Sequence, residues 1–496
     1  MRPIVSRLAF AAIVGVVGLP LASQAQAQPQ SQPADTAPIP GAPRALSIAA
    51  PIEQRLPNGL RIVLAPRPGV QLVTAQLVVL AGSEADPPTR AGLAAITASM
   101  LTKGTNRHSA TALAQAAESS GGALDSAAGW HQSEVGITVA VPQLDVALSL
   151  VSETVQRPAF AAAELDRLRT QALDELKVAY SSPATLATLT AQHLLFGTGA
   201  YGHPASGTPA SLARITRSDL LALHAARYRP DNAVLVLAGD LDAETALRLA
   251  RRHFGGWKAA GPAPPLTPVR PTANTMPIAA VIDMGSSGQA AVVLAVALPP
   301  LGPDRAAAAV LNSVLGGGFS SRLNQEIRIQ RGLSYSAGSG LDARREGGVL
   351  RAVVQTKNES AAEVAALMQA EFDKLAALPV GDDELAARKA TLIGDFSRSV
   401  ETTAGLAAAV KSLVVAGRPI ADLRTRIDAI GAVSATDVQR FAAAHLGAAN
   451  RRVAVAGEAT RFAEALKAAA PGLVIVPATA LDLERGDALA ARNRAR

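Results

Sequence analysis

The stretch ITRSDLLALHAARYRPDNAVLVLAG, residues 215–239, aligns without a gap with VSATDVQRFAAAHLGAANRRVAVAG, residues 433–457. An aspartate, an asparagine and the final glycine fall at matching positions in the two copies. Ser218 and Thr436 each precede apolar residues at helical spacing, and a short apolar run follows each asparagine. Each copy therefore predicts a helix capped at Ser218 or Thr436, then a turn and a β-strand.

Further strand-like runs precede both copies. They are GLRIVLAP (59–66) and VQLVTAQLVVLAG (70–82) in the first half, and QAAVVLAVAL (289–298) in the second. Long stretches rich in Ala and Leu at helical spacing follow them. A repeat of this size indicates duplication of a whole domain and not a solenoid of short units. The sequence predicts two homologous α+β domains.

Composition narrows the possible functions. The chain has 496 residues, of which 49% are hydrophobic and 18% charged, as in ordinary folded proteins. Aromatic residues make up only 3%, and the net charge of +7 is spread along the chain. A surface of stacked rings for single-stranded nucleic acid is not expected, and we predict no nucleic-acid partner.

The beginning of the chain has the pattern of a secretory signal. Arg2 and Arg7 precede an apolar stretch and small residues in A-x-A order. We therefore predict a signal peptide at 1–27, an exported and periplasmic protein, and no membrane span after cleavage, because no later segment approaches 18 uncharged apolar residues. The chain has no Cys, which excludes disulfides, thiol nucleophiles and Cys-based metal sites.

Segments rich in Pro set the expected domain boundaries. Residues 28–53 predict a flexible leader and 259–277 a linker between domains. The domains are then expected at 54–258 and 278–480. A basic tail, 481–496, is expected to be frayed or loosely docked.

Common catalytic motifs are missing from the sequence. None of the seven histidines is three or four residues from another, so no helix carries a pair of His ligands. Neither a calcium-binding loop nor a Gly-rich phosphate loop is present. Ser320 and Ser321 follow glycines but lack the G-x-S-x-G spacing of a serine nucleophile.

Several blocks of the chain together resemble a known family. They include RLPNGLRIVLAPRPG (55–69), AGSEADPPTRAGLAAITASMLTKGT (81–105), LLFGTGAYGHPASGTPASLARIT (194–216) and GGGFSSRLNQEIRIQRGLSYS (316–336). In this order they resemble the pitrilysin-like zinc peptidases, the inverted-motif family that includes the mitochondrial processing peptidase, over about residues 54–476. The resemblance implies two duplicated domains, each with an antiparallel-rich sheet and helices on one face, which form a clam-like half chamber.

The family's zinc motif, H-x-x-E-H, has been replaced. Aligning it with GLAAITASM places Ala95 and Ser99 at the two zinc-binding His positions and Ala98 at the catalytic Glu. The third ligand position falls on Glu175. One carboxylate does not hold catalytic zinc, which needs three protein ligands, so we interpret Glu175 as a remnant, a surface charge or a capping charge. No cofactor is expected in this chain.

The second half keeps an Arg and a Tyr that approach the substrate in two-chain members of the family. Arg328 and Tyr335 have the required spacing of seven. The resemblance gives them the role of hydrogen-bond donors to the peptide being cut. Otherwise Arg328 would pair with Glu326 or Asp342 on the surface and Tyr335 would be a half-buried strand residue. Arg331 and Arg322 are alternative candidates for the functional arginine.

Other positions have both a functional and a structural interpretation. Gly316, Gly317 and Gly318, with Phe319, are candidates for substrate binding, because glycines permit close backbone approach and unusual φ values. They would otherwise form a tight loop between helices. The segment 121–141 resembles the family's peptide-binding edge strand. We expect Trp130 and His131 within it, and His203 outside it, to be structural.

Two functions from different classes remain. In the first, the chain is the zinc-free subunit of an exported two-chain metallopeptidase and pairs with a homologous H-x-x-E-H subunit that holds zinc and acts on peptides or unfolded proteins. In the second, it is an inert scaffold or peptide-binding protein of the same fold. A self-sufficient zinc protease would require ligands that the sequence lacks.

Overall fold

The computed structural model describes residues 46–259, 261–262, 276–470, 472–484 and 489. The described residues from Ser47 onward belong to one compact unit. The predicted signal peptide and most of the predicted leader, linker and basic tail lie outside the described residues. Of the helices in the described ranges, none is both long and apolar enough to cross a membrane.

The first half begins with strand β1, which starts inside the range predicted as a leader because it pairs with β2. Its strands and helices are, in chain order, β1 (Ile52–Arg55), β2 (Arg61–Pro66), β3 (Leu72–Val79), α1 (Leu93–Leu101), α2 (Ala110–Ser119), β4 (Asp125–Ala128), β5 (Ser133–Ala140), α3 (Leu144–Gln156), α4 (Ala162–Tyr180), α5 (Pro183–Phe196), α6 (Pro209–Arg214), α7 (Arg217–Arg227), β6 (Ala233–Gly239) and α8 (Ala243–Phe254).

The second half repeats the order from β2 onward, with a π-helical segment, η6, where the first half has α2, and the counterpart of β1, strand β12, comes last in the chain instead of first. Its elements are β7 (Ala279–Asp283), β8 (Ala290–Leu298), α9 (Arg305–Gly316), η6 (Asn324–Gln330), β9 (Ala337–Arg344), β10 (Gly347–Thr356), α10 (Ala361–Ala377), α11 (Asp382–Ser399), α12 (Thr403–Val415), α13 (Asp422–Gly431), α14 (Ala435–His445), β11 (Arg451–Gly457), α15 (Ala463–Ala469) and β12 (Val474–Pro477).

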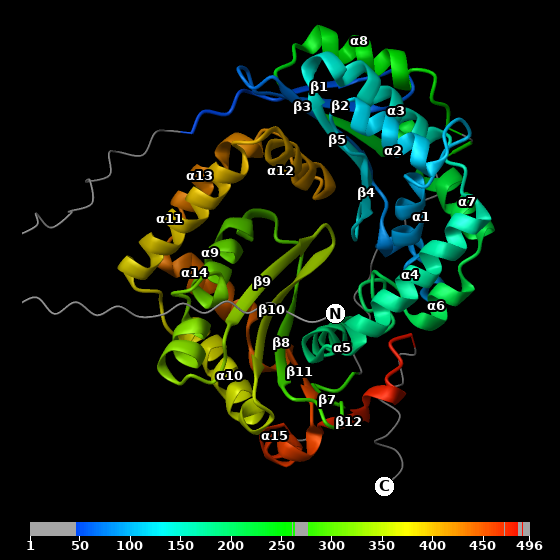
Figure 1. Cartoon of the computed structure of the whole chain (residues 1–496). Coiled ribbons are helices and arrows are strands. Elements are labelled where there is room, and N and C mark those ends of the chain that lie inside the picture. The colour runs from blue at the N-terminus through cyan, green and yellow to red at the C-terminus, as the bar shows by residue number, and fades with distance from the viewer. Residues whose placement is uncertain (1–45, 260, 263–275, 471, 485–488, 490–496) are drawn as a thin grey trace, which may run out of the picture. The chain divides into compact units, whose positions relative to one another are not determined.

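Each half forms one six-stranded mixed sheet (Figure 1). The strand orders are β1-β2-β6-β3-β5-β4 and β12-β7-β11-β8-β10-β9, so equivalent strands take equivalent places. Most neighbouring strands are antiparallel, whereas β2 and β6, and their counterparts β7 and β11, are parallel. Strand β12 is also parallel to β7, although β1 is antiparallel to β2. The predicted pair of duplicated α+β domains with antiparallel-rich sheets is confirmed.

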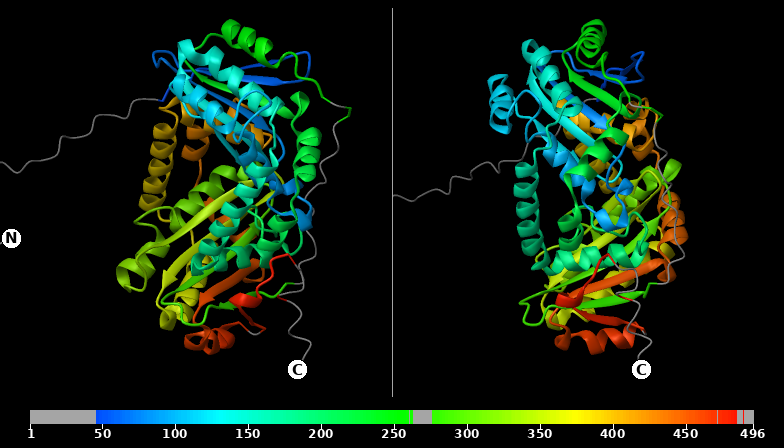
Figure 2. Two further views of the ribbon diagram at one scale, coloured as in Figure 1. Left: turned by 45° about the vertical axis from the view of Figure 1, so that its right-hand side comes forward. Right: turned by 90° about the vertical axis from the view of Figure 1, so that its right-hand side faces the viewer.

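One helix of each half packs against the sheet of the other half (Figures 1 and 2). The buried leucines of α5 share a hydrophobic cluster with the face of the second sheet that carries Val293 and Ala454. Helix α12 lies on the first sheet, where Thr74 on β3 donates a hydrogen bond to Thr403 (Oγ1–Oγ1 2.9 Å) and Lys411 pairs with Glu134 (2.7 Å). The sequence predicted helices on one face only; the opposite face of each sheet also carries a helix.

The repeated helices are capped two residues earlier than the sequence predicted. Helix α7 begins after Thr216, whose hydroxyl accepts from the Asp219 backbone N–H while the Asp219 carboxylate accepts from the Thr216 backbone N–H. Ser434 and Asp437 make the same reciprocal pair before α14. Ser218 and Thr436 therefore lie inside the first turn, because a carboxylate three residues after the cap completes the capping box.

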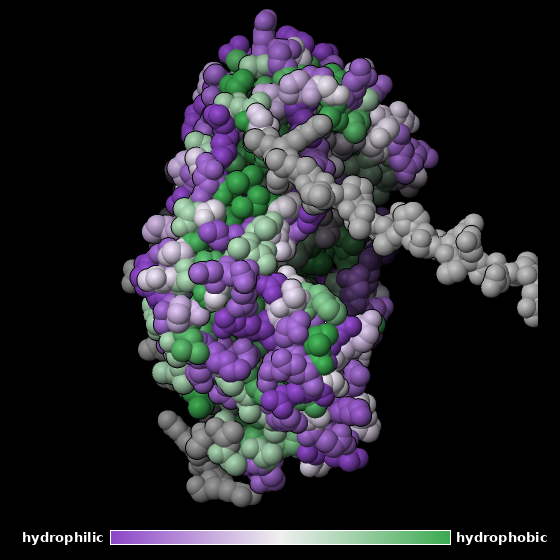
Figure 3. All heavy atoms as spheres, turned by 90° about the vertical axis from the view of Figure 1, so that its left-hand side faces the viewer, coloured by the Kyte–Doolittle hydropathy of each residue, from purple (hydrophilic) through white to green (hydrophobic). Residues whose placement is uncertain are grey.

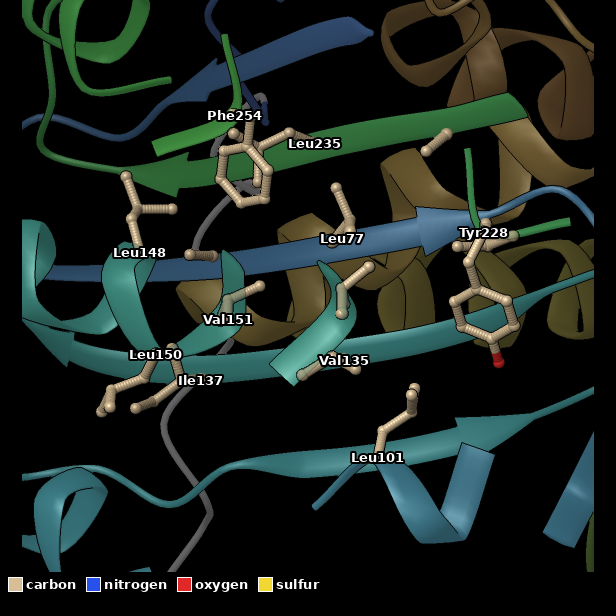
Figure 4. Close-up of a cluster of buried hydrophobic side chains, with 14 of the residues drawn as sticks. Leu77, Leu101, Val135, Ile137, Leu148, Leu150, Val151, Tyr228, Leu235 and Phe254 are labelled. Atoms are coloured by element: carbon tan, nitrogen blue, oxygen red, sulfur yellow. The ribbon is translucent and has the colours of Figure 1, made fainter. Parts of the chain in front are cut away.

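The largest apolar core fills the other side of the first sheet (Figure 4). Leu148 and Val151 on α3 face Leu77 on β3 and Ile137 on β5, and all four side chains are buried. The inward residues of each strand alternate with residues on the opposite face, as a strand with one face on a core requires. This packing holds the first sheet in place. The edge strand of that sheet, β4, contacts α1, the helix that carries the replaced zinc motif.

Candidate functional site

Helix α1 carries the three replaced motif positions. Ala98 is completely buried, and its carbonyl oxygen accepts a hydrogen bond from the Ser126 hydroxyl on β4 (2.8 Å). Ala95 and Ser99 are half-buried. The three residues share one face because positions i, i+3 and i+4 of a helix lie together. This face offers one hydroxyl and no imidazole or carboxylate.

A carboxyl group outside α1 holds the start of the helix. Asp86 accepts hydrogen bonds from the backbone N–H groups of Gly92 and Ala94, both at 2.9 Å. Burial raises the pKa of Asp86 to about 8, against the lowering effect of these two hydrogen bonds. The helix is therefore kept in place by packing and by Asp86.

Glu175 on α4 lies on an exposed part of that helix. Its carboxylate accepts a hydrogen bond from Gln171, one turn earlier (2.9 Å). Throughout the described ranges, no group of three or more His, Asp or Glu side chains is arranged to hold a metal ion. The side chains at Ala95, Ala98 and Ser99 do not fit a catalytic zinc ion, because zinc binds through nitrogen, sulfur or carboxylate ligands.

Arg328 lies between two aromatic rings in the second half. Its guanidinium carbon is 4.9 Å from the centre of the Phe319 ring and 5.0 Å from the centre of the Tyr335 ring. Phe319 is 64% exposed and Tyr335 87% exposed, so both rings face solvent. A cation over exposed rings gains about 0.5–1 kcal/mol from each contact. We call Phe319, Arg328 and Tyr335 the Arg-aromatic cluster.

The π-helical segment η6 places this cluster. Asn324 lies at its start. The side-chain amide of Asn324 donates from Nδ2 to the carbonyl oxygen of Phe319 (2.5 Å) and accepts at Oδ1 from the backbone N–H of Ala337 on β9 (3.4 Å). Gly332 then turns the chain at a φ of +63°. These contacts bring Phe319, before η6, and Tyr335, after it, next to Arg328. π-Helical turns are rare and occur frequently at functional sites.

The neighbouring arginines are engaged in ion pairs. Arg331 pairs with Glu326 (2.9 Å), and Arg322 pairs with Glu384 (2.7 Å). Asp342, the other carboxylate considered for Arg328, pairs with Arg344 (2.7 Å). In the described part of the chain no carboxylate lies within ion-pair distance of Arg328, so its N–H donors are the ones left for another molecule.

The three glycines before Phe319 have ordinary negative or extended φ values, contrary to the unusual values expected from the sequence. Gly316 is required for close approach, because a Cβ there would lie 2.2 Å from the backbone nitrogen of Ser339 on β9. Gly317 and Gly318 are exposed beside Phe319. The structure thus gives Gly316 a packing role and places Gly317, Gly318 and Phe319 on the surface.

Trp130, His131 and His203 lie together at the contact between the halves. His131 is buried and its Nε2 lies 2.6 Å from the hydroxyl of Tyr201, whose pKa burial raises to about 12. The guanidinium of Arg344, from β9, lies 4.2 Å from the Trp130 ring centre. These residues join the two halves. Strand β4, beside them in the chain, is an edge strand of the first sheet, as the resemblance implied.

Sequence reasoning did not foresee that Phe319 would stack on Arg328. It made Phe319 a candidate for substrate binding but gave it no partner, because ring contacts across a loop have no fixed spacing. An available signal in the sequence was a large apolar residue directly after three glycines. Such a residue lies in a loop, and large apolar residues exposed in loops are typical of contact surfaces.

Two family models match successive parts of the chain. Residues 61–204 match the model described as Insulinase (Peptidase family M16), and residues 214–392 match the Peptidase M16 inactive domain. A relative from Mycobacterium tuberculosis named uncharacterized zinc protease is 30% identical over 376 residues, which are 75% of this chain and 83% of the relative. The chain belongs to peptidase family M16.

Other relatives carry different names. The non-peptidase homolog YmxG of Helicobacter pylori is 26% identical over 360 residues, which cover 71% of this chain and 82% of the relative. The crystal structure of a peptidase M16 inactive domain from Pseudomonas fluorescens matches with a TM-score of 0.76 and 26% identity, over 82% of this chain and 98% of that one. This chain is an M16 protein that has lost the zinc and catalytic positions of its first half.

Proposed function

We propose that this chain is the zinc-free subunit of an exported two-chain metallopeptidase. The observation that supports it is the contrast between α1, whose motif face carries only Ala95, Ala98 and Ser99, and the exposed Arg-aromatic cluster, whose arginine lacks a carboxylate partner among the described residues. In this proposal, zinc and water activation belong to a homologous H-x-x-E-H subunit.

The role of this chain would be to position a peptide or unfolded protein. The Arg328 guanidinium and the Tyr335 hydroxyl are hydrogen-bond donors that fit a peptide carbonyl and the oxyanion that develops from it. Phe319 covers one face of the guanidinium, which restricts its orientation. Exposed rings beside a charged group are typical of surfaces that another molecule covers.

The test is to express the tagged chain in its native compartment and identify the proteins that copurify with it. We expect a homologue with an intact H-x-x-E-H helix, peptidase activity in the purified pair that a chelator abolishes, and no activity in either chain alone. Copurification of no such homologue, together with no activity after mixing with the homologous zinc subunit of the same organism, would contradict the proposal.

A scaffold or peptide-binding role is the second candidate, and the edge strand β4 favours it. Its outer side pairs with no other described strand, so an extended peptide can add there through backbone hydrogen bonds. The two candidates differ in their response to Arg328→Ala. A scaffold that binds peptide at β4 would retain its binding, whereas a half-site subunit would lose turnover.

A further inference from the structure

A pocket of about 360 Å³ lies among α9, α11, α12, α13 and strand β9 of the second half. It is separate from the Arg-aromatic cluster, none of whose residues lines it. Figure 3 shows the side of the molecule that carries α11 and α13, where apolar surface is gathered in hollows between hydrophilic rims. Apolar side chains from five elements line the pocket, namely Ala306, Leu341, Leu392, Leu413 and Ile430.

The charged residues of this pocket do not balance. Three arginines and one aspartate line it. Arg418 and Asp422 neutralise each other through an ion pair of 2.6 Å. Arg305 makes a long hydrogen bond to the Ser412 hydroxyl (3.4 Å), and Arg426 lies over the Phe396 ring at 4.9 Å. In the described ranges neither Arg305 nor Arg426 has a carboxylate within ion-pair distance, so the pocket carries two uncompensated positive charges.

These two guanidinium groups also repel each other. Burial, and then the charge of Arg418, lower the pKa of Arg305, while burial and the charge of Arg305 lower the pKa of Arg426. Arg305 is half-buried, and a charge partly withdrawn from water is costly unless a counter-charge is present, whereas Arg426 is exposed at the mouth of the pocket. A bound anion would supply that counter-charge and would remove the repulsion. The pocket therefore combines a basic end with an apolar lining.

We propose that this pocket binds a carboxylate carried on an apolar body, and that its natural ligand is the free C-terminus of a peptide that ends in an apolar residue. The planar guanidinium matches a carboxylate through two parallel hydrogen bonds. The lining of Leu341, Leu413 and Ile430 suits an aliphatic side chain. A volume of about 360 Å³ suits one or two residues and not a folded segment.

The position of β9 supports a peptide over a free acid. Leu341 and Ala343, which line the pocket, belong to this strand, and β9 is an edge strand that pairs only with β10 in the described sheet. A peptide whose last residue occupies the pocket can continue along this edge by backbone hydrogen bonding. The inference does not depend on zinc, a partner subunit or the Arg-aromatic cluster.

Isothermal titration calorimetry on the whole purified chain tests the proposal. The probes are N-acetyl-Ala-Leu as the free acid, the same dipeptide as its C-terminal amide, and octanoate. We expect the acid to bind at least about tenfold more tightly than the amide, because only the carboxylate of the acid can pair with the guanidinium groups of Arg305 and Arg426. Arg305→Gln and Arg426→Gln should each lower the affinity for the acid by about tenfold or more.

Arg424→Gln is the matched control, because Arg424 lies on the same helix as Arg426 and is exposed like it, but does not line the pocket. It should change the affinity by less than about twofold. The unfolding temperature of Arg426→Gln without ligand should stay close to that of the wild type, because relief of the repulsion from Arg305 offsets the lost contact with Phe396. That measurement separates lost binding from misfolding.

Three results would overturn the proposal. Equal binding of acid and amide, or no binding of the acid up to about 10 mM, would show that the charges do not select a carboxylate. An equal loss in Arg424→Gln would indicate a general effect of net charge. Tighter binding of octanoate than of the dipeptide acid would assign the pocket to a fatty carboxylate and would make the peptide assignment wrong.

Discussion

Helix α1 in the first half and segment η6 in the second lie in halves with the same strand order, but they present opposite surfaces. The motif face of α1 has one fully buried and two half-buried small residues, whereas η6 presents Arg328 between two exposed rings. Both segments are held by contacts that do not involve these faces, through Asp86 in one case and Asn324 in the other. The comparison teaches that packing preserves an element after its surface chemistry has changed.

The largest expected effect concerns the α1 face. Ala98→Glu would place a charge at a fully buried position without a partner and should lower the free energy of unfolding by about 3–5 kcal/mol. Ser99→Glu, at a half-buried position on the same face, should cost less than about 1 kcal/mol. Urea denaturation measures both. Equal stability of Ala98→Glu and wild type would mean that this face is open and that the comparison is wrong.

The next effect concerns η6. In the assembled peptidase, Arg328→Ala should lower kcat by about 10²–10³-fold, as loss of an oxyanion donor does, with the affinity between the subunits unchanged. Tyr335→Phe, which removes only the hydroxyl, tests the second donor in the same assay. Arg331→Ala is the control, because Arg331 pairs with Glu326. A loss of turnover that occurs in Arg331→Ala and not in Arg328→Ala would transfer the role to Arg331.

The contact between the halves should contribute less. Arg344 is buried, and its guanidinium lies 4.2 Å from the Trp130 ring centre and 4.5 Å from that of Tyr201. Arg344→Met should reduce the free energy of unfolding by about 2 kcal/mol, while the transition stays single because the two halves also share helices. Arg398→Met, which breaks an exposed ion pair with Asp395, should cost under about 0.5 kcal/mol. Two separate transitions in wild type would contradict the interlocked packing.

The smallest expected effect is a pH dependence of stability that comes from two histidines of the first half. Burial lowers the pKa of His203 and His224, both in the first half, from the ordinary 6.5. Through these two histidines the folded chain binds fewer protons than the unfolded chain around pH 6.5, so their contribution to stability falls on acidification, whereas Asp86, with its raised pKa, has the opposite effect. His224→Gln, which can still donate to the Val155 carbonyl, should reduce the fall in unfolding temperature between about pH 7.5 and 5.5. An unchanged pH response would exclude His224 as a contributor.

The sequence predicted the duplicated α+β architecture because residues 215–239 and 433–457 carry the same pattern of cap, helix and strand. It placed the caps two residues late, because Ser218 and Thr436 are good capping residues, and only the reciprocal bonds of Asp219 and Asp437 select the earlier positions. Local patterns thus identified the elements, and side-chain hydrogen bonds decided where they begin.

Features that depend on contacts between distant segments were harder to predict from the sequence. The stretches of α5 and α12 are apolar nearly all round, which signals burial on two sides, but no spacing says which sheet covers the second side. The family resemblance, through its Arg and Tyr seven residues apart, suggested Arg328 and Tyr335, and the structure brings them together. No sequence pattern indicated that Arg305 and Arg426 line one pocket, because they lie on α9 and α13 with two strands and several helices between them in the chain.

The helices α5 and α12 also bear on how the chain came to be duplicated. A single copy of the unit would leave its own α5-like or α12-like helix unpacked and one face of its sheet bare. Two identical copies would remedy both defects by exchanging that helix, which is a domain-swapped dimer with twofold symmetry. Fusion of the two genes then converts a contact between subunits into an intramolecular one. From that point the two halves were free to diverge in surface chemistry, since each still needed the other to fold.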